Sequence, residues 1–415
     1  MDVSAMSGRT RILFNLGFVA MLVGMPLATF YFAIAFVHED AALVLPDLAF
    51  WSRLVAPSLT TIALYLFWVG FQAALFHWLP GREVEGTPLR DGRRLVYRLN
   101  GLLALVVTVL VAALGVLMGV VPAGLLYDQL GAMVSTVNLV VLVGCIGLMI
   151  VARRQASPEE LRLNWLEAYT LGGCLNPRLG RFDLKFFCES RPSMILWVLM
   201  DLSFAAKQFE LHGTVSNAMV LVCFFQILYV ADYFYFEDAI LTTWDIKHEN
   251  FGFILAWGCL AWIPFAYALQ PLYLVQHPEP LPIWGAAAIF LLNAAGFYLF
   301  RSSNLQKHRF SSDPMEPIWG EKPDFIRTEQ GRLLLVSGWW GVARHANYLG
   351  DWMMGLAWSF NCGFARVLPY FYPIYFAILL LHREWRDSKH CATKYGRDWE
   401  RYTQKVRWRI VPGLY

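Results

Sequence analysis

A run of glycines, indoles and polar side chains between residues 338 and 352 carries groups that could bind a ligand. It combines Trp339 and Trp340 with Arg344, His345 and Asn347. Tryptophan offers a flat face and one N–H donor, and glycine lets a ligand approach the backbone closely. Tryptophans also form belts at membrane surfaces, but a belt does not need an arginine, a histidine and an amide beside the indoles. The run therefore predicts a binding site.

A second polar run, residues 382–415, interleaves charged side chains with tryptophans and tyrosines. On a helix, Asp387 lies four residues from both Arg383 and Cys391, so the three face the same way. A basic juxtamembrane tail would bind anionic lipid instead, but such tails contain few aromatic residues. The pattern predicts a folded cytoplasmic pocket for an anionic ligand.

A third run could move a proton. Tyr229, Asp232 and Tyr233 are spaced i, i+3, i+4, so one helix face carries two phenols and a carboxylate. Inside a membrane such a face either lines a cavity and transfers a proton or joins helices through buried hydrogen bonds. The sequence favours neither interpretation. A fourth polar stretch, residues 173–192, is interpreted as an ordered loop.

Several site classes have no support in the sequence. His308 and His345 have no cysteine or histidine partners at ligand spacing, so no metal site is predicted. Neither a glycine-rich phosphate loop nor the strand–turn–helix context of a Rossmann fingerprint is present. A nucleotide would therefore be held in a non-Rossmann manner. The net charge of +3 is too small to indicate nucleic-acid binding.

The elements that position these runs are predicted to be membrane helices. Hydrophobic residues make up 57% of the chain and charged residues 16%, whereas soluble domains carry about 25% charge. A helix crosses the hydrocarbon with roughly 20 apolar residues. We therefore predict an all-α integral membrane protein with about ten transmembrane helices, at residues 12–37, 54–79, 99–127, 129–152, 194–209, 215–236, 253–276, 281–300, 348–364 and 367–381.

Loop charge predicts the orientation. Arginines and lysines concentrate before the first predicted span, after the second, fourth and eighth, and in the tail, while the other loops are acidic. By the positive-inside rule both termini are cytoplasmic. Polar residues interrupt the apolar runs from Trp165 onward, and polar groups inside a membrane are costly and usually functional. We thus expect residues 1–165 to form a scaffold and residues 166–415 to form the catalytic region.

Taken together, these runs resemble the sterol C14-reductase and 7-dehydrocholesterol reductase family, which includes the membrane part of lamin B receptor. The resemblance extends from about Pro80 to Tyr415 and is strongest in residues 334–348 and 382–415, with support at residues 176–178, 182–185 and 241–246. It implies a ten-helix protein whose C-terminal half holds NADPH at the cytoplasmic side, next to a sterol cavity open to lipid. Because no soluble chromatin-binding domain precedes the first span, we expect a bacterial Δ14-sterol reductase in the inner membrane, or one in the endoplasmic reticulum of a eukaryote.

The resemblance also implies which residues contact the cofactor. Lys307 and Lys394 are suited to phosphates, and Trp340 and Tyr348 to flat rings, while Arg383 is expected to hold Asp387 in place. The full implied set is Lys307, Leu335, Trp340, Asn347, Tyr348, Asp387, Cys391, Ala392, Thr393, Lys394, Tyr395 and Tyr402.

The family's reaction protonates an isolated sterol double bond and quenches the carbocation with hydride from NADPH. That chemistry needs an acid beside the ring and a dry pocket. We expect Tyr229 to be the donor, helped by Asp232 or Glu237, with Tyr402 as the second candidate. A phenol has a pKa of about 10, so it needs a neighbouring proton relay.

Two other functions remain open. Isoprenylcysteine methyltransferases, which use S-adenosylmethionine, have a similar C-terminal pattern but are much shorter. A protein that binds sterol or lipid without catalysis is the other alternative, because the family pattern is altered at Cys174, Cys259, Ser311 and Ser388. The expected partners are a sterol, NADPH and membrane lipid, without nucleic acid.

Overall fold

The computed structural model describes residues 8–89 and 92–415. These residues form two compact units, 1–278 and 279–415, each of which is described by itself. Helices dominate both units. Within the described ranges, sheet structure is limited to three antiparallel hairpins, which pair β1 (Arg82–Glu85) with β2 (Val96–Leu99), β3 (Arg178–Leu179) with β4 (Phe182–Asp183), and β5 (Phe325–Arg327) with β6 (Leu333–Leu335).

The prediction of a mostly helical membrane protein is confirmed. Helical structure lies within each of the ten predicted spans. Six helical segments in the described part of the chain are long and apolar enough to cross a membrane, so the count of ten crossings and the cytoplasmic termini stay predictions. The six are Thr10–His38, Leu59–Trp78, Leu130–Gln155, Asn217–Tyr235, Phe253–Leu274 and Ile283–Ser312.

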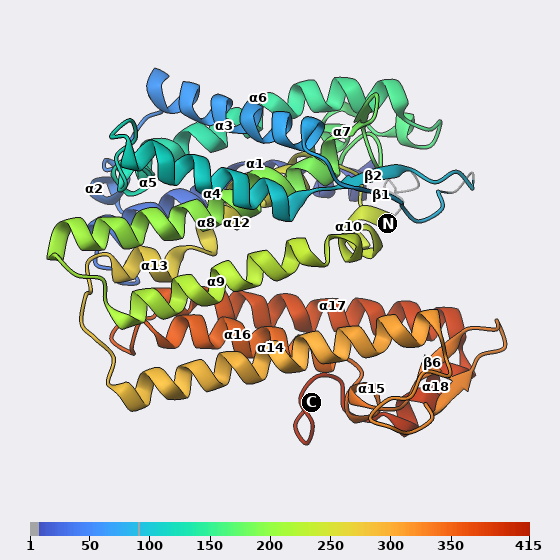
Figure 1. Ribbon diagram of the computed structural model, residues 1–415. Coiled ribbons are helices and arrows are strands. Elements are labelled where there is room, and N and C mark those ends of the chain that lie inside the picture. The colour runs from blue at the N-terminus through green and yellow to red at the C-terminus, as the bar shows by residue number, and fades with distance from the viewer. Residues whose placement is uncertain (1–7, 90–91) are drawn as a thin grey trace. The chain divides into compact units, whose positions relative to one another are not determined.

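The first unit is organised around α8 (Leu184–His212), most of whose side chains are buried. Asp183 caps its start by accepting a hydrogen bond from the Phe186 backbone N–H, and Gly213 ends it in the left-handed conformation. The helices in contact with α8 include α3 (Leu59–Trp78), α4 (Gly101–Leu117), α5 (Leu125–Asp128) and α9 (Asn217–Tyr235), as Figure 1 allows the reader to follow.

The remaining helices of this unit surround that group. Two long helices, α1 (Gly8–His38) and α6 (Leu130–Gln155), pack against each other, and α6 also packs against α3. The connections contain short helices: α2 (Leu48–Trp51), η2 (Glu160–Arg162), α7 (Trp165–Leu171), η3 (Glu237–Thr242) and α10 (Trp244–His248).

One predicted span, residues 253–276, is not a continuous α-helix. It begins as α11 (Phe253–Trp257), widens into a π-helical turn, η4 (Gly258–Trp262), and continues as α12 (Ile263–Ala266) and α13 (Leu269–Leu274). Pro264 is the second residue of α12, the helix that follows the π turn. Because proline has no N–H and its ring clashes with the preceding turn, a local change of helical hydrogen bonding is expected there.

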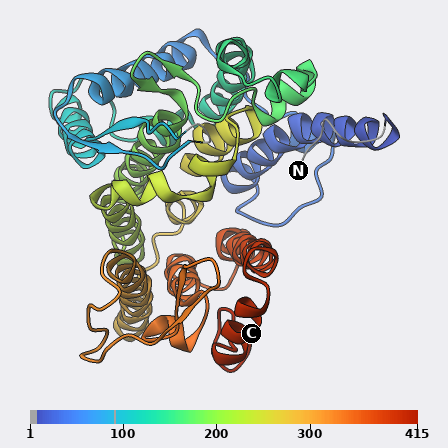
Figure 2. The same ribbon diagram turned by 90° about the vertical axis from the view of Figure 1, so that its right-hand side faces the viewer.

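The second unit contains three long helices, α14 (Ile283–Ser312), α16 (Ala346–Phe360) and α17 (Phe371–Tyr395). Figure 2, which views them nearly along their axes, shows α16 between α14 and α17. Two glycines let α14 and α16 approach closely: a Cβ at Gly350 would lie 2.5 Å from the Phe300 backbone nitrogen and 2.6 Å from the Gly296 carbonyl oxygen. Small residues at such crossings are typical of helices that pack in membranes.

The polar tail is folded, as its aromatic content predicts. Instead of ending with the predicted span at residue 381, α17 continues to Tyr395, and η5 (Leu368–Tyr370) precedes it. Gly396, at φ +52°, turns the chain into α18 (Arg397–Lys405). Trp399, Tyr402 and Val406 of this last segment pack against side chains of the β5–β6 hairpin region and of α17.

Candidate functional site

The run that begins at Gly338 is anchored to α14. Gly338 has φ +60°, a conformation that favours glycine, and a Cβ there would lie 2.5 Å from the side-chain oxygen of Gln306. The same Gln306 oxygen accepts a hydrogen bond of 2.9 Å from the Trp339 backbone N–H. The Trp340 indole N–H donates to the Ser303 carbonyl at 2.8 Å. These bonds fix the short helix α15 (Trp339–Val342) against the cytoplasmic end predicted for α14.

A cation lies over a fixed aromatic face in this region. Trp340 is buried in a cluster with Phe310 and Leu335. The Lys307 ammonium nitrogen lies 4.2 Å from the centroid of the Trp340 ring, while the Lys307 side chain remains exposed. An ammonium over an indole is attracted by the negative ring face. The contact therefore holds a positive charge beside a flat surface, which suits a phosphate next to a stacked ring.

His345 and Asp387 form the centre of the site. His345 is 7% exposed, and its ring stacks on Tyr348 with centroids 4.7 Å apart and planes 15° apart. Its Nε2 lies 3.7 Å from Asp387 Oδ2. Burial, with the positive charges of Lys307 and Arg344, lowers the pKa of His345 to about 3. The imidazole is therefore neutral at pH 7.

The Asp387 side chain is half-exposed, and two opposing effects act on its pKa. Burial raises the pKa of Asp387, and the nearby Lys307 charge opposes that rise. The Cys391 thiol, one helical turn further along α17, lies 4.0 Å from Asp387 Oδ2. Burial raises the pKa of Cys391 to about 11, so Cys391 is a thiol at neutral pH. The contact between Arg383 and Asp387 that the resemblance implies stays a prediction.

The C-terminal segment holds the Arg344–His345 backbone in place. The Arg344 N–H donates to the Trp408 carbonyl at 3.0 Å, and the His345 N–H donates to the Arg409 carbonyl at 2.8 Å. Arg409 in turn donates to the fully buried Glu384 of α17 at 3.3 Å. The tail thus connects the glycine- and tryptophan-rich run to α17.

Tyr402 lies in a neighbouring aromatic cluster. Its ring stacks on Trp399, with centroids 5.0 Å apart, and Cys391 and Tyr395 pack against the same cluster. Burial raises the pKa of Tyr402, although the Arg344 charge opposes the rise, so its phenol is protonated at neutral pH. The other members of the predicted 391–395 run, Ala392, Thr393 and Lys394, are exposed.

Buried polar atoms without partners allow a test of whether these residues suit NADPH. Within the described ranges, Asn347 Oδ1, His345 Nε2 and Arg344 Nε have no hydrogen-bond partner. A buried polar group left unsatisfied costs about 1–3 kcal/mol. The other Asn347 side-chain group donates to Asn304 at 3.2 Å, which fixes the amide. Donors, an acceptor, a cation and flat aromatic faces therefore occur together, and this set fits a phosphate-bearing dinucleotide.

The predicted proton-donor face lies on α9, in the first unit. Tyr229 and Asp232 are both half-buried. The Tyr229 ring lies 6.0 Å from that of Trp197, whose indole N–H donates to Gln226 at 3.0 Å. The Trp197 indole therefore lies beside the Tyr229 phenol, and its hydrogen bond to Gln226 fixes the orientation of the indole.

Glu237 is engaged with Arg191 and with the start of α4. It forms an ion pair with the fully buried Arg191, and its second oxygen accepts a 2.9 Å hydrogen bond from the Gly101 N–H at the start of α4. Arg191 also donates to Asn100 at 2.9 Å. Burial raises the pKa of Glu237, against the effect of Arg191. These contacts join three elements of the first unit.

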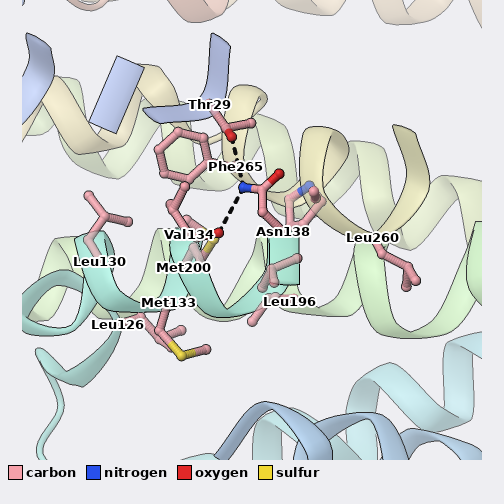
Figure 3. A pocket seen from close by; sticks show the side chains of 13 residues that line it. Thr29, Leu126, Leu130, Met133, Val134, Asn138, Leu196, Met200, Leu260 and Phe265 are labelled. Carbon is pink, nitrogen blue, oxygen red and sulfur yellow. Dashed lines mark hydrogen bonds between the residues drawn. The ribbon is translucent and has the colours of Figure 1, made fainter. Parts of the chain in front are cut away.

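Figure 3 shows an apolar cavity in the first unit, lined by residues of α1, α5, α6, α8, η4 and α12. Asn138 is one of the lining residues, and its side chain donates hydrogen bonds to the Thr29 hydroxyl at 3.0 Å and to the Val134 carbonyl at 2.8 Å. The cavity measures about 40 Å³, whereas pockets for drug-sized ligands measure about 300–1,000 Å³. It is too small for a sterol, and the sterol cavity implied by the resemblance stays a prediction.

Several supporting residues were not predicted. Ser303 and Gln306 bind the tryptophan-rich run, and Glu384 binds the tail, but none was singled out from the sequence. Ser303, Gln306 and Lys307 are spaced i, i+3, i+4, so they share a helix face. This spacing could have identified Ser303 and Gln306 as neighbours of Lys307 from the sequence. Glu384, an acidic residue in a basic run, gave no comparable indication.

Comparisons with known proteins agree on one family. The family model described as "Ergosterol biosynthesis ERG4/ERG24 family" matches residues 13–415. The chain is 47% identical over 407 residues to a protein of Methylotuvimicrobium alcaliphilum named Delta(14)-sterol reductase, covering 97% of this chain and 95% of the relative. It is 43% identical over 412 residues to the Delta(14)-sterol reductase TM7SF2 of Mus musculus, covering 96% of each. A Delta(14)-sterol reductase of Dictyostelium discoideum is 45% identical over 363 residues, 86% of this chain and 79% of the relative.

Proposed function

The chain belongs to the ergosterol biosynthesis ERG4/ERG24 family, and from this premise we propose that it reduces the C14 double bond of a sterol with NADPH. The observation that carries the cofactor assignment is the grouping of Lys307 over Trp340 with the buried His345 beside Asp387. The reaction assignment is supported by relatives named Delta(14)-sterol reductase, at 40–47% identity over most of the chain. Those relatives give no support to the methyltransferase alternative.

In this proposal, the chain binds NADPH through residues 307–402. Lys307 pairs with a phosphate, while Trp340 and Tyr348 supply flat faces on which rings stack. Asn347 and Asp387 hydrogen-bond ribose or amide groups, and Lys394, at the end of α17, meets a second phosphate. When bound, NADPH supplies a hydride from its nicotinamide ring.

The proton comes from the α9 face. Tyr229 donates a proton to C15 of the sterol, because this leaves the more stable tertiary cation at C14. Asp232, three residues along the same face, passes a replacement proton to the phenol. The indole of Trp197, 6.0 Å from Tyr229, stabilises the cation through its ring face. Tyr402 is the second candidate donor, and the ion pair with Arg191 supports a structural role for Glu237.

The membrane setting follows from the apolar helices. Six helical segments in the described part of the chain are suited to crossing a bilayer, and a sterol reaches such a protein from the lipid. We propose that all ten predicted spans cross, with both termini cytoplasmic, and that residues 166–415 carry the chemistry on a scaffold of residues 1–165. A bacterial inner membrane remains the proposed location.

Product analysis tests the function. Purified full-length protein is incubated with NADPH and a Δ14-sterol, and separately with Δ7- and Δ24-sterols, and the products are analysed by mass spectrometry. We expect conversion of the Δ14-sterol to a product that has gained two hydrogens. An unchanged Δ14-sterol that remains bound would favour the non-catalytic alternative. Reduction of only the Δ7- or Δ24-sterol would contradict the proposed substrate.

A further inference from the structure

The His345 imidazole is buried, oriented and without a hydrogen bond at Nε2. The ring stacks on Tyr348, and its backbone N–H donates to the Arg409 carbonyl at 2.8 Å. Its Nε2 has no hydrogen-bond partner among the described residues and faces Asp387 Oδ2 at 3.7 Å. That distance is too long for a direct hydrogen bond. An oxygen or nitrogen of a ligand can, however, lie within hydrogen-bond distance of both atoms.

The two side chains offer complementary chemistry. In the tautomer with its proton on Nε2, which the facing carboxylate favours, His345 donates a hydrogen bond and Asp387 accepts one. A phosphate oxygen only accepts, and the Asp387 charge would repel it. A ribose hydroxyl or a carboxamide both accepts and donates, so either matches the pair.

We propose that His345 is a further cofactor-binding residue, which donates a hydrogen bond to a ribose hydroxyl or to the carboxamide of NADPH while Asp387 accepts one from the same group. This assignment rests on the proposed NADPH-dependent function. It adds His345 to the residues implied by the family resemblance and gives its unsatisfied nitrogen a partner. The Asp387 side chain of the pair is half-exposed.

The environment of His345 keeps it suited to this role. The charged groups that act on it are Lys307 of α14 and Arg344 beside it, and Asp387 of α17 faces its Nε2. The two cations and burial lower the pKa of His345 to about 3, so it binds as a neutral donor across the physiological range. Because stacking on Tyr348 already fixes the ring, little conformational entropy is lost when the ligand binds.

His345→Phe separates ligand binding from folding. Phenylalanine keeps a ring on Tyr348 and leaves the backbone bond to Arg409 intact, but it removes the donor nitrogen. We expect NADPH to bind full-length, detergent-solubilised His345→Phe at least about tenfold more weakly than the wild type, as measured by quenching of tryptophan fluorescence. The unfolding temperature without nucleotide should change little. His345→Gln, which restores a donor nitrogen, should recover part of the affinity, and His308→Phe, at an exposed histidine of α14, should bind as the wild type does.

A second nucleotide identifies the group that His345 contacts. 2′-Phospho-ADP-ribose lacks the nicotinamide but keeps ribose hydroxyls. If His345→Phe weakens both nucleotides, the contact is a hydroxyl; if it weakens only NADPH, the contact is the carboxamide. If His345→Phe binds both nucleotides as tightly as the wild type does, the assignment of His345 is overturned while the proposed function stands. A wild-type protein that binds neither nucleotide would overturn the assignment together with the proposed function.

Discussion

Two polar centres of this chain, one in each unit, differ in how their buried ionisable groups are paired. In the first unit, the fully buried Arg191 meets Glu237, Asn100 and the ring of Phe76, 5.3 Å from its guanidinium carbon. In the second, the buried His345 faces a half-exposed carboxylate across 3.7 Å without a hydrogen bond at Nε2. A buried charge paired with an opposite charge of the protein holds elements together, whereas a facing pair that makes no hydrogen bond is available to a ligand.

The largest effect expected from this contrast is loss of folding when the Arg191 centre is broken. Glu237→Leu leaves a buried guanidinium without its carboxylate and without the bond to Gly101. We expect a loss of about 3–5 kcal/mol in stability, measured as a lower unfolding temperature and a smaller monodisperse fraction in detergent. The double variant Arg191→Met with Glu237→Leu removes both charges and should recover much of that stability. If Glu237→Leu alone is as stable as the wild type, the Arg191 centre is not structural.

The next largest effect concerns the proton donor. Tyr229→Phe removes the proposed acid but keeps the ring beside Trp197. Turnover of the Δ14-sterol should fall at least about 100-fold, since general acids contribute about 10²–10⁴-fold, while the affinity for NADPH should be unchanged. Tyr402→Phe is the matched comparison, because Tyr402 packs with Cys391 and Tyr395 of the proposed cofactor site. A greater loss of turnover in Tyr402→Phe, with NADPH affinity retained, would make Tyr402 the donor.

Acid should destabilise the protein through His345. The unfolded imidazole titrates near pH 6.5, whereas burial and the charges of Lys307 and Arg344 lower the pKa of the folded one to about 3. As the pH falls below 6.5, the unfolded state gains a proton that the folded state does not, so stability is lost. At pH 5 the loss is about 2 kcal/mol.

Unfolding temperatures of the wild type and His345→Phe between pH 7 and pH 4 measure this loss. The wild type should lose more stability than the variant on acidification. The raised pKa of Asp387 acts in the opposite direction, but it is present in both proteins and affects the comparison less. Identical pH profiles would show that His345 does not remain neutral in the folded protein.

The smallest effect should come from the exposed cation. Lys307→Met keeps an apolar chain over Trp340 but removes the charge. NADPH binding should weaken about tenfold at low ionic strength and less at high salt, because phosphate contacts of exposed lysines are screened. Lys322→Met, at another exposed lysine of the same unit, is the control and should bind NADPH normally. Equal affinities of the two variants would remove Lys307 from the cofactor site.

The sequence predicted the helices better than their contacts. Helical structure lies in each run that apolar length selected, because a bilayer requires about 20 apolar residues whatever surrounds them. The same rule ended the last span at residue 381, although α17 continues to Tyr395, since charged residues end an apolar run without ending a helix. The sequence also predicted polar clusters whose members are close along the chain. Tyr229 and Asp232, for example, are three residues apart and therefore share a helix face.

Long-range pairings could not be predicted in the same way. Lys307 meets Trp340 and Arg191 meets Glu237 only because helices distant in sequence pack together, and no periodicity encodes such a contact. The family resemblance supplied Lys307 and Trp340 as a set, but it did not indicate that Glu237 is held in an ion pair. His345 was recognised as a polar member of its run, whereas its position opposite Asp387 required the structure.

Isotope transfer from the cofactor tests the central claim most directly. Full-length protein is supplied with a Δ14-sterol and NADPH that carries two deuterium atoms at nicotinamide C4, and the product is analysed by mass spectrometry and NMR. We predict one deuterium at C14 of the reduced sterol, and, in a parallel reaction with ordinary NADPH in D₂O, one deuterium at C15. A reduced sterol that carries no deuterium from the labelled cofactor would contradict the account.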